Sequence, residues 1–439
     1  MFWFAYNVLF AVGYGVTFPY YLARMLRRGG YRQGFLERFG AYPAERVRAI
    51  RERPRVWVHA VSVGEVLVAL RFIEEVRRRG GPHGFVLSTT TSTGHALAGR
   101  SLHRDDVLVY FPVDFAPVLR RVFAVVQPRA LVLTETELWP NVIHHARQRG
   151  VPVILLNGRL SARSFRGYRH FRWFFRRVLG EMDLLCTQSP ADADRALALG
   201  AAADAVVTCG STKYDSARVE PESAAKAEAI LHAAGIAGSD PIIVGGSTWP
   251  GEETVLLEAY VRLKARFPGL RLVLVPRHVE RTPQILPQLA AGGLRVMQRS
   301  RLRPDAAPGA AADVLLVDTT GELRHFYARA TVIFVGKSLT QTGGQNPIEP
   351  AAYGRPIVVG PHMENFAEVM QDFLEAAAVV QVQDAAGLER ELARFLADPT
   401  ACAAFGRRAA AVVESRRGAL QRTLGYIDAR WPGLLAPKV

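Results

Sequence analysis

Carboxylates that follow apolar, strand-like runs are the residues of this sequence best placed for acid–base chemistry. Glu65 ends the tetrapeptide SVGE after the run RVWVHAV, and Glu135 and Glu137 follow the run ALVLT. A carboxylate at a helix start that lines a site can take a proton from an attacking hydroxyl. Ser62 and Glu65 also have the spacing of a capping box, in which the glutamate only helps to begin a helix. Both interpretations of Glu65 stay open at this point.

The segment GGQNPIE (343–349) is typical of a site for a phosphate and a ribose. It follows the apolar run TVIFV and precedes a helix-like stretch. Unpaired N–H groups and the positive end of the helix dipole attract a phosphate there, and Glu349 can accept hydrogen bonds from ribose hydroxyls. The same residues can simply begin a helix, with Asn346 as N-cap, Pro347 in the first turn and Glu349 reaching back.

Further polar loops follow other apolar runs. Lys213 in GSTKYD would suit a carboxylate or a phosphate, and Arg277 in PRH could hold a phosphate through two N–H groups. Small residues in GGSTWPGEE (245–253) let backbone N–H groups approach an anion, and DTTGEL (318–323) again opens a helix. In the second half of the chain, four such loops are expected to converge on one edge of one sheet.

The elements that must position these loops are alternating strand-like runs and helical patterns. This alternation predicts parallel sheets covered on both faces. Ligands of such sheets bind beyond the carboxyl ends of the strands, where every motif above falls. The strand-like runs cover 55–61, 84–90, 107–112, 130–134, 151–157, 183–188 and 205–210 in the first half, and 241–246, 271–276, 314–318, 331–336, 356–360 and 377–382 in the second.

The length of 439 residues predicts two domains, because it exceeds what one ordinary core organises. A linker with one amphipathic helix is expected around 216–240. We therefore expect an N-terminal membrane anchor at 1–23 and two Rossmann-like domains at 24–218 and 219–439. An alternative for the last helix is that it crosses back to the N-terminal domain.

Cysteine usage and net charge restrict the possible classes of function. Three scattered cysteines without CxxC spacing favour a reducing compartment and argue against a zinc site or a disulfide framework. The net charge of +15 suits nucleic acid, anionic lipid or a phosphorylated substrate. Arginines and aromatic residues interleave at 159–177, a pattern compatible with single-stranded nucleic acid or a membrane surface. No nucleic-acid-binding motif accompanies the cluster, so the membrane is favoured.

Residues 2–23 carry no charge and are long enough to cross a bilayer as a helix, which takes about 20 residues. The positive-inside rule then places the main body on the cytoplasmic face, and the features of a cleaved signal peptide are missing. Asn7 and Pro19 weaken the span, so an interfacial anchor and a buried helix of the first domain remain alternatives. The arginines that would follow the anchor are Arg24, Arg27, Arg28, Arg32 and Arg38.

The motifs, in their order, resemble Kdo transferase (3-deoxy-D-manno-octulosonic acid transferase). The resemblance runs from the N-terminus to about residue 425. It rests on SVGE (62–65), TETELWPN (134–141), NGRLSARS (157–164), GSTKYD (210–215), GSTWPGEE (246–253), LVPRH (274–278) and GGQNPIEPAAYGRPIVVGPHMENF (343–366).

The resemblance implies an α/β protein of the GT-B class, with two Rossmann-like domains facing across a cleft. It implies an inverting glycosyltransferase at the cytoplasmic face of the inner membrane. The donor would be CMP-Kdo and the acceptor a lipid A precursor of the lipid IVA type, in lipopolysaccharide assembly. An anionic membrane surface would be a partner and nucleic acid would not. No cofactor or metal is expected, because CMP carries a single phosphate and the chain has no DxD pair.

Matched to the family motifs, Glu65 falls at the catalytic base, and Glu135 and Lys213 fall at positions that stabilise the transition state. The segments that would contact CMP contain Pro276, Arg277, Gly321, Glu322, Leu323, Asn346, Pro347, Ile348 and Glu349.

Three residues depart from the family pattern. Gln345 stands where the family usually has His, Lys337 where it usually has Gly, and Trp249 where it usually has His. Gln345 keeps hydrogen-bonding ability but cannot become cationic at neutral pH.

Three other classes of function remain alternatives. One is another GT-B sugar-nucleotide enzyme, such as a UDP-sugar transferase or an epimerase. The second is a membrane-anchored nucleotide-binding protein without catalysis, and the third is a nucleic-acid binder.

Overall fold

The computed structural model describes residues 1–28, 34–81, 83–217, 219–290, 292–303 and 310–435. Among the arginines expected to follow an anchor, Arg32 lies outside the described residues, and so do the side chains of Arg24, Arg27 and Arg28. The chain divides into two compact units. The first contains residues 1–215 and 418–439, and the second contains residues 216–417.

The first unit is built on a parallel sheet of seven strands in the described part of the chain, in the order β3-β2-β1-β4-β5-β6-β7. The alternation of apolar runs predicted this sheet, and the prediction is confirmed. The strand order reverses between β1 and β4, which makes that position the topological switch point. The strands are β1 (Arg55–Ala60), β2 (Gly84–Thr89), β3 (Val107–Tyr110), β4 (Ala130–Thr134), β5 (Val153–Gly158), β6 (Leu184–Thr187) and β7 (Val206–Thr208).

The second unit has a sheet of the same kind, with seven parallel strands among its described residues in the order β10-β11-β9-β8-β12-β13-β14. Its switch point lies between β8 and β12. The sequence did not predict β10, which is three half-buried residues long. The strands are β8 (Ile242–Thr248), β9 (Arg271–Pro276), β10 (Val296–Gln298), β11 (Val314–Leu316), β12 (Val332–Val335), β13 (Ile357–Val359) and β14 (Val380–Gln381).

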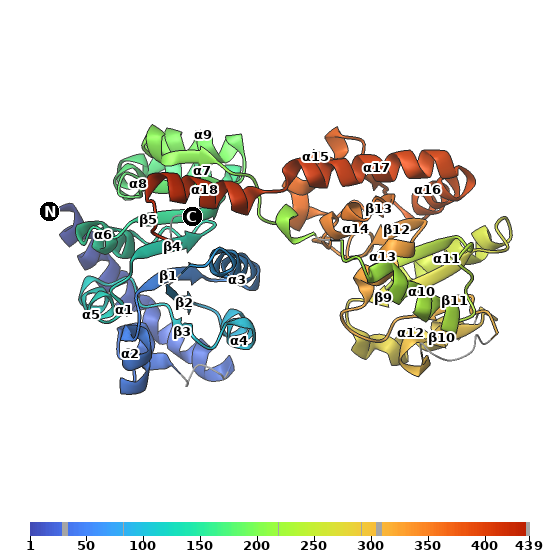
Figure 1. The fold of residues 1–439 in the computed structure, drawn as a ribbon, viewed down its shortest axis with the longest axis horizontal. Helices are drawn as coiled ribbons and strands as arrows, with labels where there is room; N and C mark the ends of the chain where they lie inside the picture. The colour runs from blue at the N-terminus through green and yellow to red at the C-terminus, as the bar shows by residue number, and fades with distance from the viewer. Residues whose placement is uncertain (29–33, 82, 218, 291, 304–309, 436–439) are drawn as a thin grey trace. The chain divides into compact units, whose positions relative to one another are not determined.

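Helices connect the strands in each unit (Figure 1). Those of the first unit are α1 (Phe2–Arg28), α2 (Ala44–Arg51), α3 (Val63–Arg78), α4 (Ser92–Ser101), α5 (Ala116–Val126), α6 (Pro140–Gln148), α7 (Ala162–His170), α8 (Arg172–Leu179), α9 (Pro190–Leu199) and α18 (Ala419–Arg430). Those of the second are α10 (Ser223–Ala233), α11 (Glu252–Lys264), α12 (Thr282–Ala290), α13 (Leu323–Arg329), α14 (Ile348–Ala352), α15 (Ala367–Glu375), α16 (Ala385–Ala397) and α17 (Pro399–Arg416).

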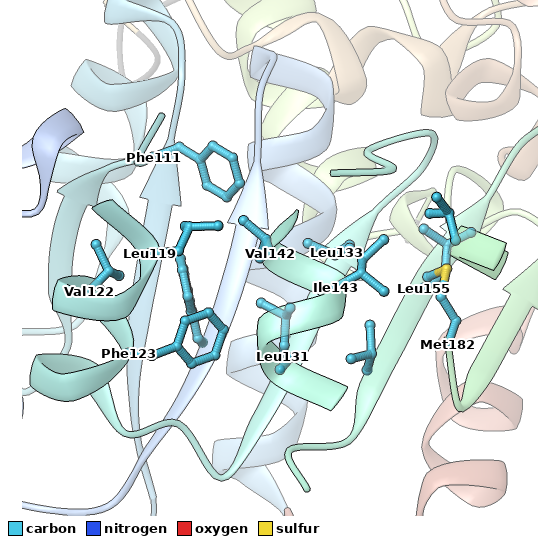
Figure 2. Packing of buried hydrophobic residues seen from close by; sticks show 14 of the residues in the cluster. Phe111, Leu119, Val122, Phe123, Leu131, Leu133, Val142, Ile143, Leu155 and Met182 are labelled. Atoms are coloured by element: carbon cyan, nitrogen blue, oxygen red, sulfur yellow. The ribbon is translucent and has the colours of Figure 1, made fainter. Parts of the chain in front are cut away.

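The first sheet buries both of its faces, as an all-parallel sheet must. Successive residues of a strand point to opposite faces, so Leu131 belongs to one apolar cluster and Val132 to the other. On one face α5 and α6 cover the strands, with Leu119, Phe123 and Ile143 among the packed side chains (Figure 2). The other face is covered by α3 and α18. This double cover holds the carboxyl edge of the sheet in place.

The C-terminal helix α18 completes the first unit after the chain has passed through the second. Leu424 and Ile427 are buried in the cluster that also contains Val58 and Ile154. The Asp215 carboxylate accepts hydrogen bonds from the N–H groups of Gly418 (2.6 Å) and Leu420 (2.8 Å). This contact joins Asp215, where the first segment of this unit ends, to Gly418 and Leu420, where its C-terminal segment begins.

The helix α1 differs from the expected membrane span. Within the described residues, none of the helices has the length and apolarity that a bilayer crossing requires, so the expected transmembrane helix is not supported. The first turns of α1 pack on the rest of the first unit. The Trp3 ring stacks on His144 at 4.0 Å, the Tyr6 hydroxyl donates to Asp114 (3.1 Å), and the Asn7 amide donates to Asn141 (3.0 Å).

Candidate active site

Glu65 lies at the first turn of α3, beyond the carboxyl end of β1. Its carboxylate accepts hydrogen bonds from Val61 N (2.9 Å), Ser62 N (3.3 Å), Ser62 Oγ (2.8 Å) and Thr134 Oγ1 (3.1 Å). Ser62 Oγ in turn accepts from Glu65 N, so the capping box is present. A carboxylate has about four lone-pair positions, and all of them are engaged here. The hydrogen bond from Thr134 also ties Glu65 to the end of β4.

Glu137 brings a second carboxylate to the same switch point. Its Oε2 accepts a hydrogen bond from Trp139 Nε1 at 2.7 Å. Burial, together with the negative charges of Glu65 and Glu135, raises the pKa of Glu137 to about 7. A carboxyl with such a pKa can hold or release a proton near neutral pH, which is a property of general acids and bases.

Beside Glu137 lies His59, a fully buried residue of β1. Its Nδ1 is 3.0 Å from the Ser88 carbonyl oxygen, which assigns the ring proton to Nδ1. Its Nε2 has no hydrogen-bond partner and lies 3.9 Å from Glu137 Oε2. Burial lowers the pKa of His59 to about 3, so the ring stays neutral at physiological pH. His59 therefore offers no positive charge that would lower the pKa of Glu137.

Glu135 and Lys213 come from different loops that one buried side chain connects. The Asn157 amide nitrogen lies 3.5 Å from Glu135 Oε1, and its amide oxygen accepts a hydrogen bond from Thr212 N (3.0 Å). Thr212 immediately precedes Lys213. Glu135 and Asn157 both have positive φ, of 52° and 56°. A non-glycine residue in that region is uncommon and is enriched at functional sites.

Buried acidic side chains hold the loops at the edge of the second sheet. The fully buried Glu252 carboxylate accepts hydrogen bonds from four backbone amides, those of Trp249 (2.9 Å), Lys337 (2.8 Å), Ser338 (2.9 Å) and Leu339 (3.0 Å). It thereby joins the loop after β8 to the loop after β12, which are the two sides of the switch point. Such charge-assisted hydrogen bonds are the strong ones.

The neighbouring Glu253 joins the loops after β8 and β9. It accepts from Thr248 Oγ1 (2.9 Å) and forms a two-point ion pair with Arg281 (2.7 and 3.1 Å). Arg281 lies four residues after Arg277. The backbone N–H of Arg277 donates to Thr248 O (3.1 Å), while its side chain is exposed. The structure thus places Pro276 and Arg277 at the carboxyl end of β9 with the guanidinium in solvent.

The segment of Gly321, Glu322 and Leu323 leads from β11 into α13. Gly321 has a φ of 86°, and the Glu322 side chain is engaged by Thr319 Oγ1 and by Arg299, whose Nη2 lies 2.8 Å from Glu322 Oε1. Glu322 is therefore already held by an arginine of the same unit.

The structure of the 343–349 loop corrects one prediction. The helix α14 begins at Ile348 with Pro347 at the N-cap position, and it has no capping box. Asn346 Oδ1 accepts a hydrogen bond from Ile348 N (3.0 Å), whereas Glu349 is exposed and does not reach back. Because the N-cap is Pro347 and not Asn346, Glu349 is the second helical residue and not the third, where a capping-box glutamate stands, and its carboxylate is in solvent.

The structure thus brings Glu65 and Glu137 together at the edge of the first sheet and connects the loops of Glu135 and Lys213. The nine residues predicted to contact CMP lie at the end of β9 (Pro276) or on loops and helix starts at the carboxyl edge of the second sheet. Sequence reasoning assigned no role to Thr134, Asn157 or Glu252. The positions of Thr134 and Asn157 at strand ends were visible, but their hydrogen-bond partners are distant in sequence. In the part of the chain that the structure describes, no three His, Cys, Asp or Glu residues form a group suited to a metal ion.

Comparisons with known proteins agree with these features. Residues 33–216 match the family described as 3-Deoxy-D-manno-octulosonic-acid transferase (kdotransferase), and residues 254–412 match Glycosyl transferases group 1. A 3-deoxy-D-manno-octulosonic acid transferase of Bordetella pertussis is 36% identical, with 92% of this chain and 94% of the relative covered. Another from Haemophilus influenzae is 31% identical, with 90% and 91% covered.

A solved structure supports the fold. The UDP-GlcNAc 2-epimerase of Neisseria meningitidis, bound to UDP-GlcNAc, is similar with a TM-score of 0.56. It is 12% identical and the match covers 86% of this chain and 99% of the epimerase, so the likeness concerns the GT-B fold alone. From the curated relatives, the chain belongs to the 3-deoxy-D-manno-octulosonic acid transferase family and is a glycosyltransferase.

Proposed function

We propose that this protein transfers Kdo from CMP-Kdo to a phosphorylated lipid A precursor in lipopolysaccharide assembly. Membership of the family and the ordered motifs support the reaction class. The observation that carries the proposal is the hydrogen bond from Thr134 to Glu65 at the switch point of the first sheet, which places the proposed base beside the loop of Glu135 and Glu137. Ligands of such sheets bind at this position.

In the proposed reaction an acceptor hydroxyl oxygen forms a bond to the anomeric carbon of Kdo. The bond from that carbon to the phosphate oxygen breaks, and CMP leaves with the electron pair. The hydroxyl proton goes to Glu65, and rotation of the Ser62 hydroxyl frees a lone pair for it. Attack opposite the leaving group inverts the anomeric centre through an oxocarbenium-like state.

The proposed roles of the other residues follow from their charge. Lys213 stabilises the negative charge of the donor, and Glu135 stabilises the positive charge that develops on the sugar. In the second unit, Arg277 and the loop amides near Gly321 and Asn346 stabilise the phosphate as it leaves. The exposed Arg277 guanidinium is consistent with this role.

Mass spectrometry of lipid products tests the function. Purified protein, CMP-Kdo and a tetra-acylated lipid A precursor are expected to give the mass of one or more added Kdo units. Glu65→Gln serves as the control for catalysis. Binding of CMP without any product would favour a nucleotide-binding protein, and turnover of a UDP-sugar in place of CMP-Kdo would favour another GT-B enzyme.

We further propose that α1 lies on a membrane surface. Phe4, Val8, Val12, Val16 and Tyr20 recur every four residues on one side of the helix, with exposed fractions of 47% to 76%. Phe171 and Trp173 are also exposed, and Phe2 is 5.8 Å from Trp173 between ring centroids. The surrounding arginines of α7 and α8 suit anionic headgroups. The exposed arginines there are Arg163, Arg166, Arg169, Arg172, Arg176 and Arg177.

Substitutions within this stripe test the attachment better than deletion of 1–23, which would also remove the contacts of Tyr6 and Asn7. The double variant Val12→Glu, Val16→Glu is expected to lose sedimentation with anionic vesicles and to keep turnover of a detergent-dispersed acceptor. Val261→Glu, at an exposed apolar residue of α11, is the matched control. Unchanged sedimentation of the double variant would contradict the proposal.

A further inference from the structure

Lys337 has a backbone conformation that its side chain does not favour. It lies two residues beyond β12, at the switch point of the second sheet, with a φ of 57°. A left-handed conformation is unfavourable for a residue with a Cβ, and glycine is the residue that adopts it freely. Strained residues of this kind persist where the surrounding structure fixes them, and they cluster at ligand sites.

Backbone contacts fix Lys337 on both sides. Its N–H donates to Glu252 Oε2 (2.8 Å), and its carbonyl oxygen accepts from Gly344 N (2.9 Å). Neither contact needs a lysine side chain, so glycine would serve the backbone better. The reason for a lysine must therefore be sought in its ammonium group.

That ammonium lies over the face of Trp249, 4.7 Å from the ring centroid. Such a cation–π contact is attractive and holds the side chain in one place. Among the described residues, no carboxylate forms a salt bridge with Lys337, since Glu252 is occupied by backbone amides and Glu253 by Arg281. The positive charge is positioned, but it is not neutralised.

Trp249 adds a hydrogen-bond donor to the same place. Its Nε1 is buried and has no hydrogen-bond partner among the described residues. A buried donor without an acceptor is costly and calls for an explanation. The ring also contacts His278, with centroids 5.2 Å apart, beside the exposed Arg277. Trp249 thus connects the Lys337 ammonium to an unpaired N–H and to the loop after β9 that carries Arg277.

Gly343, the first residue of the 343–349 motif, lies directly beside the Lys337 ammonium. A Cβ placed on Gly343 would come within 3.4 Å of Lys337 Nζ and 2.7 Å of Asn365. The loop that begins the 343–349 motif therefore approaches the ammonium without side chains in between.

We propose that Lys337, held on Trp249, binds the anionic oxygens of the donor and helps to select it. This inference rests on the proposed function, since the donor has two such groups, the nucleotide phosphate and the sugar carboxylate. Lys337 is then a specificity-determining residue. Glycine would suit the backbone conformation better, but it would not supply the positive charge.

Binding and kinetics of Lys337→Gln and Lys337→Arg test the proposal. For Lys337→Gln, the Kd of CMP or the KM of CMP-Kdo is expected to rise about tenfold, because a charge-assisted hydrogen bond is lost. Lys337→Arg should restore most of the affinity. A higher Kd for CMP assigns Lys337 to the phosphate. An unchanged Kd with a higher KM for CMP-Kdo assigns it to the carboxylate. Trp249→Phe, which keeps a ring and removes the N–H, should have a smaller effect of the same kind.

Lys337→Gly separates binding from folding. It relieves the left-handed strain, so its Tm is expected to rise while ligand binding weakens. Ala377→Gly is the matched control, because Ala377 also has a positive φ, of 47°, and follows α15 away from these loops. It should raise Tm and leave binding unchanged.

Wild-type affinities for CMP and CMP-Kdo in both Lys337→Gln and Lys337→Gly would overturn the proposal. If the wild-type protein itself bound no CMP, the proposed function would fail instead. The variants would then be compared with inorganic phosphate as the probe. Weaker phosphate binding by Lys337→Gln would still support an anion site, and equal binding would refute it.

Discussion

The two switch points of this protein have the same strand geometry and opposite chemistry. At the first, between β1 and β4, the side chains of Glu65 and Glu137 lie together and their charges repel. At the second, between β8 and β12, the acidic Glu252 is fully hydrogen-bonded and the charge left over is the ammonium of Lys337. The proposed function assigns a proton acceptor to one unit and an anion site to the other.

The backbone is bent in a similar way at both places. Glu135 directly follows β4 with a φ of 52°, and Lys337 comes two residues after β12 with a φ of 57°. At both places the backbone N–H of the bent residue is hydrogen-bonded, to Leu156 O at Glu135 and to Glu252 at Lys337. The difference between the two sites therefore comes from side chains rather than from topology. This is the general experience that fold alone does not specify function.

The largest expected effect is at the first switch point. Glu65→Gln removes the proposed base, and we expect the rate of Kdo transfer at saturating substrate to fall about 10²- to 10⁴-fold. Binding of CMP should be unchanged, because the second unit is not altered. Near-normal transfer by this variant would show that Glu65 is not the base, and the two switch points would then not differ in the proposed way.

A stability measurement sharpens the comparison at the second switch point. Glu252→Gln leaves buried amides without acceptors, and we expect the free energy of unfolding to fall by about 3 kcal/mol. CMP binding should weaken as well, because the loops after β8 and β12 lose their connection. Glu258→Gln, at an exposed residue of the same helix, is the control in urea unfolding. Equal stability of the two variants would argue against the role of Glu252.

The pH dependence of stability distinguishes the two sites further. The folded-state pKa of Glu137 is about 7, above its ordinary value near 4.5. Its protonated form is therefore favoured by folding, and this contribution is lost as the pH rises from about 4.5 to about 7. Glu137→Gln is permanently neutral in the same place.

We therefore expect Glu137→Gln to be more stable than the wild type at pH 8, by up to about 3 kcal/mol, and equally stable near pH 4.5. Thermal unfolding across this range measures the difference. Lys337→Gln should show no such pH-dependent gain. A constant difference between Glu137→Gln and the wild type at all pH values would refute the raised pKa.

The sequence predicted the sheets because buried parallel strands are continuous apolar runs, which local patterns reveal. It also predicted which loops reach the edge. It failed where partners are distant along the chain or where elements are short. Asn157 and Thr212 are 55 residues apart, and β10 has three half-buried residues. The capping box at Glu349 was wrong because the spacing alone does not show that the helix begins one residue later, with Pro347 and not Asn346 at the N-cap.

The prediction of a membrane span in the N-terminal segment failed for a related reason. Hydropathy counts apolar residues, but it does not show which of them pack on the protein itself. Trp3, Tyr6 and Asn7 contact α5, α6 or the loop before α5, while Phe4 and Val8 remain exposed. The same limit applies to the linker expected around 216–240. Its helix, α10, buries Ala227 and Ile230 and is part of the second unit.

The return of α18 to the first unit sets an order of synthesis and folding. The second unit is one continuous segment, so it is complete on the ribosome while the first still lacks a helix. Until Leu424 and Ile427 arrive, the apolar face around Val58 and Ile154 has no cover from α18. A chain that ends prematurely near residue 417 would therefore keep the second unit complete and lose stability in the first unit, which carries Glu65.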